Sequence, residues 1–292
     1  ARRVVVTGAG IVTALGVGWE VNARGLRGGR SAIRKITLFD TAQQRTQQGG
    51  EVALPDHVNP GKLTSRQAKR LDRASNLLLL AGHEAWDQAG WGDEERALEP
   101  PLVIGTSAGG MSLGEAYYQQ AHAEPRRRHA QATRVALYQP QSQILNLCQA
   151  LGFAGPITIV SNACASGADA VGQAYRLIRQ GRASCAVAGG YDALCRLVYA
   201  GFDSLQALSP TLPRPFDVDR DGLSLGEGAA VLMLEDAERA RARGAKVLGE
   251  IIGYGASTDV HHLTQPHPDG VAALASMTAA CSEAGISPGE ID

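Results

Sequence analysis

A single cysteine, Cys164, stands among very small residues in the stretch V-S-N-A-C-A-S-G-A-D-A, Val160 to Ala170. The β-branched residues before it, 156–160, predict a buried strand, and the residues after it have helical spacing. A cysteine at a helix N-terminus lies at the positive end of the helix dipole, which favours the thiolate. Small neighbours let a substrate approach closely, so the pattern predicts a nucleophile. A small buried cysteine is the alternative.

The other four cysteines predict no chemistry of their own. Each falls within an apolar helix or strand, where we expect a buried structural residue: Cys148, Cys185, Cys195 and Cys281. No C-x-x-C pair is present, so we expect neither a disulfide framework nor a zinc site, and a cytoplasmic location. His261 and His262 are adjacent and lack the i, i+4 spacing of a helical metal pair, so we predict no metal site.

The composition predicts a globular α/β protein. The chain has 292 residues, of which 44% are hydrophobic and 35 are glycine, enough for a large core in one or two domains. The formal net charge of -1 creates no global field for nucleic acid or an anionic membrane. No apolar run approaches the roughly 18 residues of a membrane span, and we expect no signal peptide at the N-terminus.

Apolar strand-like runs alternate with helical patterns along the chain. The expected strands are residues 3–8, 101–107, 157–161, 185–190, 229–236 and 247–257. The expected helices are residues 65–89, 141–150, 165–180, 237–243 and 270–285. Strands that are apolar throughout are typical of a sheet with helices on both faces. Gly8 and Gly10 match only half of a dinucleotide-binding motif, so we interpret them as glycines that let a strand turn sharply.

Two sequence blocks together carry a family resemblance. S-N-A-C-A-S-G-A-D-A, followed by R-P-F-D-V-D-R-D-G-L-S-L-G-E-G-A-A-V-L-M-L-E-D (Arg214 to Asp236), resembles the elongating β-ketoacyl-acyl-carrier-protein synthases of the thiolase-like superfamily. The stretches R-R-V-V-V-T-G-A-G-I-V-T-A-L-G, I-G-T-S-A-G-G and G-Y-G-A-S-T-D-V-H-H support it, and it covers essentially the whole chain. The resemblance implies an αβαβα layered sandwich. Residues 1–246 would form the half that carries the nucleophile, and residues 247–292 would begin the second half.

The resemblance implies an acyltransferase. Such an enzyme moves an acyl chain from acyl carrier protein to Cys164, then condenses it with malonyl-carrier to extend a fatty-acid, polyene or polyketide chain. The substrates are attached to the carrier's phosphopantetheine, and no other cofactor is implied. The implied partners are acyl carrier protein and a second subunit, in a homodimer or a heterodimer of the ketosynthase/chain-length-factor type. A non-catalytic homologue that serves as the structural partner of an active ketosynthase is the alternative.

The family takes two histidines, a lysine and a Gly-Phe-Gly loop from its second half. The sequence ends before any of them, and none of its seven histidines has the family's sequence context. We therefore expect that the chain lacks the C-terminal part and that residues 1–292 alone do not catalyse condensation.

The resemblance also implies residues that bind the substrate and the carrier. Arg66, Lys69 and Arg70 would meet the acidic carrier protein, although a solvated helix face is the alternative. Ala108 falls where long-chain relatives carry a bulky aliphatic residue that gates the acyl channel. We therefore predict that long, unsaturated or aryl-capped acyl chains are accepted, unless a neighbouring side chain fills the space. Phe202 would line the pocket beside the nucleophile, with core packing as the alternative. A loop that resembles the mobile gate of the acyl pocket, or else a plain surface loop, carries Thr258, Asp259, His262 and Thr264.

Overall fold

One central sheet organises the molecule. The computed structural model describes residues 1–127, 133–262 and 265–292. The sheet has the order β2-β1-β8-β7-β5-β6, and β9 pairs with β1 beside β2. Its strands are β1 (Val4–Thr13), β2 (Gly16–Val17), β5 (Leu102–Gly105), β6 (Ile157–Val160), β7 (Cys185–Asp192), β8 (Gly228–Asp236) and β9 (Gly249–Ile251). β5 runs parallel to β6 and β7, and the other pairs are antiparallel. The short pair β3 (Arg34–Lys35) and β4 (Gln48–Gly49) lies apart.

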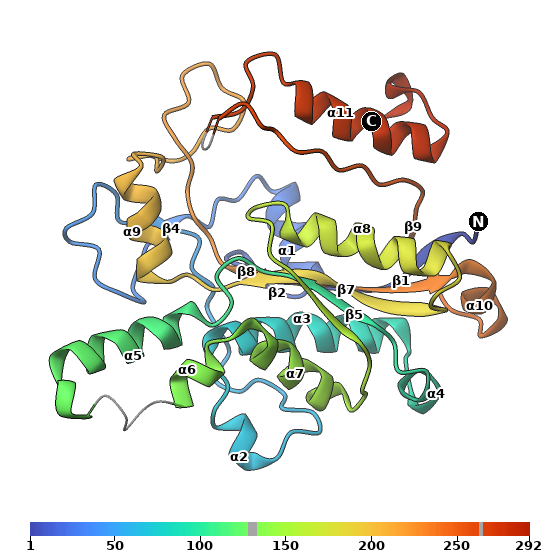
Figure 1. The fold of residues 1–292 in the computed structure, drawn as a ribbon, viewed down its shortest axis with the longest axis horizontal. Helices are drawn as coiled ribbons and strands as arrows, with labels where there is room; N and C mark the ends of the chain where they lie inside the picture. Colours follow the sequence, from blue (N-terminus) through green and yellow to red (C-terminus); the bar gives the residue numbers. More distant parts are fainter. Residues whose placement is uncertain (128–132, 263–264) are drawn as a thin grey trace.

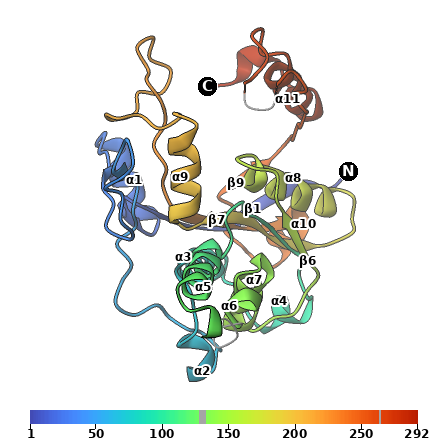
Figure 2. The ribbon, with the colours of Figure 1, turned by 60° about the vertical axis from the view of Figure 1, so that its left-hand side comes forward.

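Helices cover both faces of this sheet. Within the described residues they are α1 (Trp19–Arg27), α2 (Ser65–Ala68), α3 (Arg73–Ala89), α4 (Asp93–Ala97), α5 (Met111–Ala123), α6 (Thr133–Leu137), α7 (Pro140–Leu151), α8 (Ser166–Arg179), α9 (Arg196–Ser204), α10 (Ala237–Ala242) and α11 (Val271–Ala284). α3 and α7 lie below the sheet and α8 lies above it (Figure 1). The same layers are visible after rotation, with α11 beyond α8 (Figure 2). The predicted layered α/β architecture is thus confirmed.

The apolar strands fill two cores, one on each face. Leu77, Leu78 and Ile144 belong to the core formed with α3 and α7, and Ala174 and Ile178 belong to the core formed with α8. Because both faces are covered, the central strands are apolar throughout instead of alternating.

Two expected elements differ from the observed ones. The helix predicted over residues 65–89 is broken, because Asp72 caps α3 by accepting a hydrogen bond from the Ser75 N–H at 2.9 Å. Of the strand predicted over residues 247–257, only residues 249–251 form a strand, β9. It pairs with β1 at the edge of the central sheet. The division of the chain at residues 246 and 247 stays a prediction.

The role expected of Gly8 and Gly10 was wrong. Both lie inside strand β1, which continues to Thr13; the pairing with β8 shifts register between Val6 and Gly8, but the chain does not leave the sheet there. A Cβ on Gly8 would lie 2.1 Å from the Ala85 carbonyl oxygen, and one on Gly10 would lie 1.9 Å from that of Ala81. Glycine is needed at these positions because α3 packs directly on the strand backbone.

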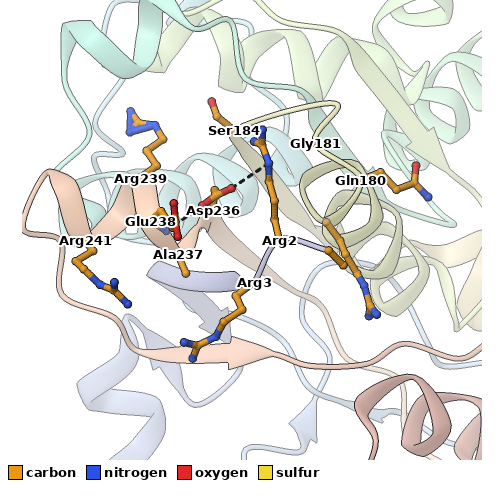
Figure 3. Close-up of a pocket in the computed structure, with 12 residues that line it drawn as sticks. Arg2, Arg3, Gln180, Gly181, Ser184, Asp236, Ala237, Glu238, Arg239 and Arg241 are labelled. Atoms are coloured by element: carbon orange, nitrogen blue, oxygen red, sulfur yellow. Dashed lines mark hydrogen bonds and ion pairs between the residues drawn. The ribbon is translucent and has the colours of Figure 1, made fainter.

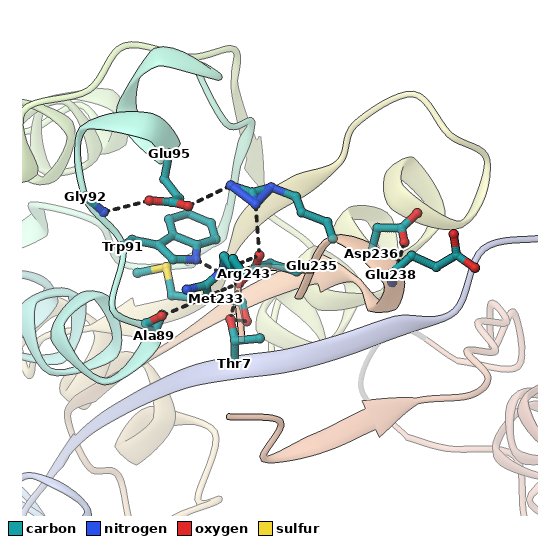
Figure 4. A network of polar contacts seen from close by, with 11 residues as sticks. Thr7, Ala89, Trp91, Gly92, Glu95, Met233, Glu235, Asp236, Glu238 and Arg243 are labelled. Carbon is teal, nitrogen blue, oxygen red and sulfur yellow. Dashed lines mark hydrogen bonds and ion pairs between the residues drawn. The ribbon is translucent and has the colours of Figure 1, made fainter. Parts of the chain in front are cut away.

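A buried carboxylate, Glu235 at the end of β8, joins three further parts of the fold (Figure 4). It accepts hydrogen bonds from the Thr7 hydroxyl at 2.6 Å, from the Trp91 indole at 2.9 Å and from the Arg243 guanidinium at 3.0 Å. Burial raises the pKa of Glu235, but these hydrogen bonds outweigh burial, so its pKa lies below the ordinary value. The charge therefore holds β1, the loop before α4 and the end of α10 together.

Among the described helices, none combines the length and the apolar character that crossing a bilayer requires.

Candidate active site

Cys164 lies in the turn between β6 and α8, and its side chain is exposed. The residue before it, Ala163, has φ 46, a left-handed conformation that costs a non-glycine residue free energy. The Ala163 carbonyl accepts hydrogen bonds from the hydroxyls of Ser166 at 2.6 Å and Ser107 at 2.9 Å. The Ser166 hydroxyl also accepts from the Asn162 N–H at 2.8 Å. These contacts hold the strained turn, which presents the thiol at the N-terminus of a 14-residue helix.

The other cysteines lie in a different environment. Cys148, Cys185, Cys195 and Cys281 are buried, as predicted. Burial raises the thiol pKa to about 11 for Cys148 and Cys185, and to about 12 for Cys195. These three thiols are therefore protonated at neutral pH, and exposure separates Cys164 from them.

A hollow of about 560 Å³ opens beside Cys164. Its walls come from β1, β5, β7, β8 and the start of α8, and they combine small residues such as Gly105, Gly167 and Gly190 with larger ones such as Tyr191 and Leu232. No histidine is among the lining residues, all of which are described. The small residues next to Cys164 leave room for a thioester to approach the thiol.

Asp192 connects this hollow to the loop that follows β5. Asp192 lines the hollow, and its Oδ1 accepts hydrogen bonds from the Thr106 hydroxyl at 2.8 Å, the Ser107 N–H at 3.0 Å and the Ala108 N–H at 2.7 Å. Ala108 is buried and does not line the hollow, but its N–H donates to Asp192, which does. Its role in substrate selection stays a prediction.

The predicted substrate residues Phe202, Thr258, Asp259 and His262 do not line this hollow. Phe202, on α9, is half-buried and packs against the small cluster formed by Ile36, Tyr199 and Leu208, which is the packing alternative. Thr258, Asp259 and His262 lie in an exposed segment after β9. The backbone N–H groups of His267 and His261 donate to Asp259 at 2.8 and 3.0 Å and lower its pKa. Thr264 lies outside the described residues.

The predicted carrier-docking residues form an exposed basic group. Arg66 lies in α2, and Lys69 and Arg70 follow it directly. All three side chains are exposed, and none of them forms an ion pair with another described residue. Figure 1 shows α2 at the lower edge, beyond α3 and α7. No group of three or more potential metal ligands occurs within the described ranges.

A larger hollow of about 950 Å³ lies near the chain's first residues (Figure 3). It is lined by Arg2, Arg3 and Arg241 and by acidic side chains, and Arg2 pairs with Asp236 at 3.3 Å. Gln180 and Gly181 of its wall lie at the C-terminal end of α8, whereas Cys164 precedes the other end, about 20 Å away along the helix. Its lining contains no cysteine or histidine, so we assign the chemistry to the smaller hollow.

Sequence reasoning missed Ser107, Asn162 and Asp192 as parts of the site. A usable signal existed for some of them, because polar residues that directly follow buried parallel strands gather at one edge of a sheet. Ser107 follows β5, Asn162 follows β6, and Asp192 ends β7.

Comparison with known proteins identifies the family. The family described as "Beta-ketoacyl synthase, N-terminal domain" matches residues 1–240. The chain belongs to the β-ketoacyl synthase family.

Relatives of known name or structure agree with this membership of the β-ketoacyl synthase family. A 3-oxoacyl-[acyl-carrier-protein] synthase 2 of Synechocystis sp. is 37% identical, over 98% of this chain and 70% of the relative. The solved ishigamide ketosynthase/chain length factor has a TM-score of 0.90 and 34% identity, over 100% of this chain and 72% of the other. A type II polyketide synthase acyl-carrier protein in complex with its ketosynthase has a TM-score of 0.84 and 26% identity, over 99% and 71%. The predicted thiolase-like fold is confirmed by these matches.

Proposed function

We propose that this chain is a β-ketoacyl-acyl-carrier-protein synthase in which Cys164 carries the acyl chain as a thioester. The observation that supports this best is the exposed thiol of Cys164, in a strained turn beside an open hollow, in a member of the β-ketoacyl synthase family. A non-catalytic role as partner of another ketosynthase is disfavoured by the same thiol.

The first step is an exchange of thioesters. The Cys164 thiolate attacks the carbonyl carbon of the acyl-carrier thioester, and the carbonyl oxygen becomes an oxyanion. The positive end of the α8 dipole would stabilise that oxyanion. The intermediate collapses, the carbon–sulfur bond to the carrier breaks, and the carrier leaves as a thiolate that takes up a proton.

The second step extends the chain. Malonyl-carrier loses carbon dioxide, and the resulting carbanion attacks the acyl thioester on Cys164. A carbon–carbon bond forms, the Cys164 thiolate leaves, and the product is a β-ketoacyl-carrier. The expectation that residues 1–292 alone do not complete this step stays a prediction, as does the expectation that no cofactor is needed beyond the carrier's phosphopantetheine.

The proposal extends to partners and location. The exposed Arg66, Lys69 and Arg70 offer a basic surface to an acidic acyl carrier protein. A second subunit, either a copy of this chain or a chain-length-factor-type homologue, is supported by the similarity to the ishigamide ketosynthase/chain length factor. We place the protein in the cytoplasm, where its exposed thiol stays reduced.

Mass spectrometry of the protein after incubation with acyl-carrier substrates tests this function. The acyl group should be found on Cys164 in the parent and should be absent in Cys164→Ser. A matched control, Cys148→Ala, removes a buried thiol and should retain acylation. Acylation on Cys148, Cys185, Cys195 or Cys281 in the Cys164→Ser variant would refute the assignment, and no acylation of the parent would favour the non-catalytic role.

A further inference from the structure

The turn before Cys164 is held from a second direction by side chains that the proposed reaction does not use. Asn162 donates its side-chain Nδ2 to Asp169 Oδ2 at 2.6 Å. Asp169 lies in the first turn of α8, and its Oδ1 accepts a hydrogen bond from the Tyr254 hydroxyl at 2.5 Å. One carboxylate therefore joins the nucleophile's turn to a residue three positions beyond β9.

Tyr254 lies between α11 and α8. The glycines on either side of it approach α11, since a Cβ on Gly253 would lie 2.3 Å from the Ala280 carbonyl oxygen and one on Gly255 would lie 2.1 Å from that of Ser276. The Tyr254 ring lies over α8, where a Cβ on Gly172 would be 2.4 Å from the ring. Glycine at these positions lets the segment fit closely against both helices.

Charged groups fix Tyr254 in this place. Its backbone N–H donates to Glu283 at 2.9 Å, and Glu283 forms an ion pair with Arg179 of α8 at 2.9 Å. The Arg176 guanidinium lies 5.0 Å from the centre of the Tyr254 ring, a cation–π contact. Burial and the neighbouring Asp169 carboxylate raise the pKa of Tyr254 to about 12, so the phenol donates its proton at neutral pH.

We propose that Asp169 and Tyr254 are positioning residues for Cys164, and that they couple its turn to the segment that carries Thr258 and Asp259. This inference rests on the proposed role of Cys164 as the nucleophile. If the segment moved away, the Tyr254 hydroxyl would no longer donate to Asp169. Of the two side-chain donors, Asp169 would then keep only Asn162. The carboxylate would no longer be fixed beside Asn162, and the orientation of the thiol would depend on the position of the segment.

A double-mutant cycle on the full chain tests the coupling. The measured quantity is the rate at which iodoacetamide alkylates Cys164, followed by mass spectrometry, in the parent, Asn162→Ala, Tyr254→Phe and the double variant. Each single substitution should slow alkylation about threefold to tenfold, and the double variant should be no slower than the slower single, because members of one network are not additive. Single-variant effects that multiply in the double variant would overturn the coupling.

Tyr175→Phe is the matched control. Tyr175 lies on α8, and its hydroxyl donates to the Ile252 carbonyl at 3.2 Å and accepts from the Arg179 guanidinium. This variant therefore removes a hydrogen bond between α8 and the same segment but keeps the Tyr254 hydroxyl that donates to Asp169. Its alkylation rate should stay within about twofold of the parent, and a slowing equal to that of Tyr254→Phe would refute a specific route through Asp169. Asn162→Ser replaces Asn162→Ala if the latter does not fold. If the proposed function is wrong, the parent protein will show no acylated Cys164 in the acylation experiment. The alkylation experiment needs no carrier protein, so the two failures can be told apart.

Discussion

The Ser107 hydroxyl lies 2.9 Å from the carbonyl oxygen of Ala163, and this hydrogen bond ties the loop after β5 to the turn that presents Cys164. Ala163 is held at φ 46, so the turn depends on bonds of this kind to keep its conformation. Asp192 fixes the other side of the same loop by accepting the N–H groups of Ser107 and Ala108.

Removal of that hydroxyl should loosen the turn. Ser107→Ala should lower the free energy of unfolding by about 1 kcal/mol and slow acylation of Cys164 about threefold. Ser161→Ala is the control, because the Ser161 side chain is exposed and forms no hydrogen bond with another described residue. Denaturant titration and single-turnover acylation measure the two effects. An equal loss in both variants would show that Ser107 has no special part in holding the turn.

The basic group near α2 should attract the acidic acyl carrier protein at long range. Reversal of Arg66, Lys69 and Arg70 to glutamate should raise the KM for an acyl-carrier substrate about tenfold at low salt, with kcat little changed. The effect should fade above about 0.5 M salt, because the Debye length then falls to a few ångströms. Reversal of three exposed cations elsewhere, Arg24, Arg27 and Lys246, is the control. The docking role fails if both triple variants give the same KM.

Ala108 should influence the length and rigidity of the acyl chain that is accepted. Ala108→Ile adds about three methylene-sized groups, which would exclude a part of the chain worth about 2 kcal/mol, or roughly 30-fold in rate. The variant should retain activity with a short saturated substrate and lose it with a long rigid one. Competition between the two acyl-carriers measures this ratio. An unchanged ratio would mean that a neighbouring side chain already fills the space.

Glu235 should make stability depend on acid pH. Its pKa is lowered in the folded protein, so its contribution is fully present above its unfolded value of about 4.3 and is lost as pH falls through the folded pKa. Glu235→Gln should therefore destabilise the protein at pH 7 by about 3 to 5 kcal/mol, because Arg243 loses its buried partner, and the difference should narrow below pH 4. Thermal unfolding from pH 3 to pH 7 would reveal the trend, and a constant difference would contradict it.

Sequence patterns predicted the elements that lie between two apolar layers. The strands around Val103, Ile159 and Val187 and the helix that follows Cys164 were predicted well, since burial on both faces leaves a continuous apolar run. Helices α1, α5 and α9 were missed. The apolar spacing of α5 is weak, but α1 and α9 are clearly amphipathic and could have been predicted from their spacing.

The site was predictable only in part. Cys164 could be found because its neighbours are small and its place between a strand and a helix is visible in the sequence. The position of Ser107 and Asp192 at the ends of buried strands could have placed them at this edge of the sheet, but their hydrogen-bond partners lie more than 50 residues away, and no local pattern identifies those partners. Phe202 occupies a sequence position that the family resemblance assigns to the pocket, but its side chain packs in a separate cluster and does not line the hollow.

The pairing of β1 has a consequence for the newly made chain. Val4 lies opposite both Asp236 and Ile251, so the first half of β1 meets these two partners only after more than two hundred further residues, although its other end pairs with β2 at once. At 5 to 20 residues per second, their synthesis takes roughly 10 to 50 s. During this time β1 cannot complete the sheet and exposes an apolar edge. We therefore expect this sheet to be completed only after β8 and β9 have been synthesised, and the nascent chain to need a chaperone until then.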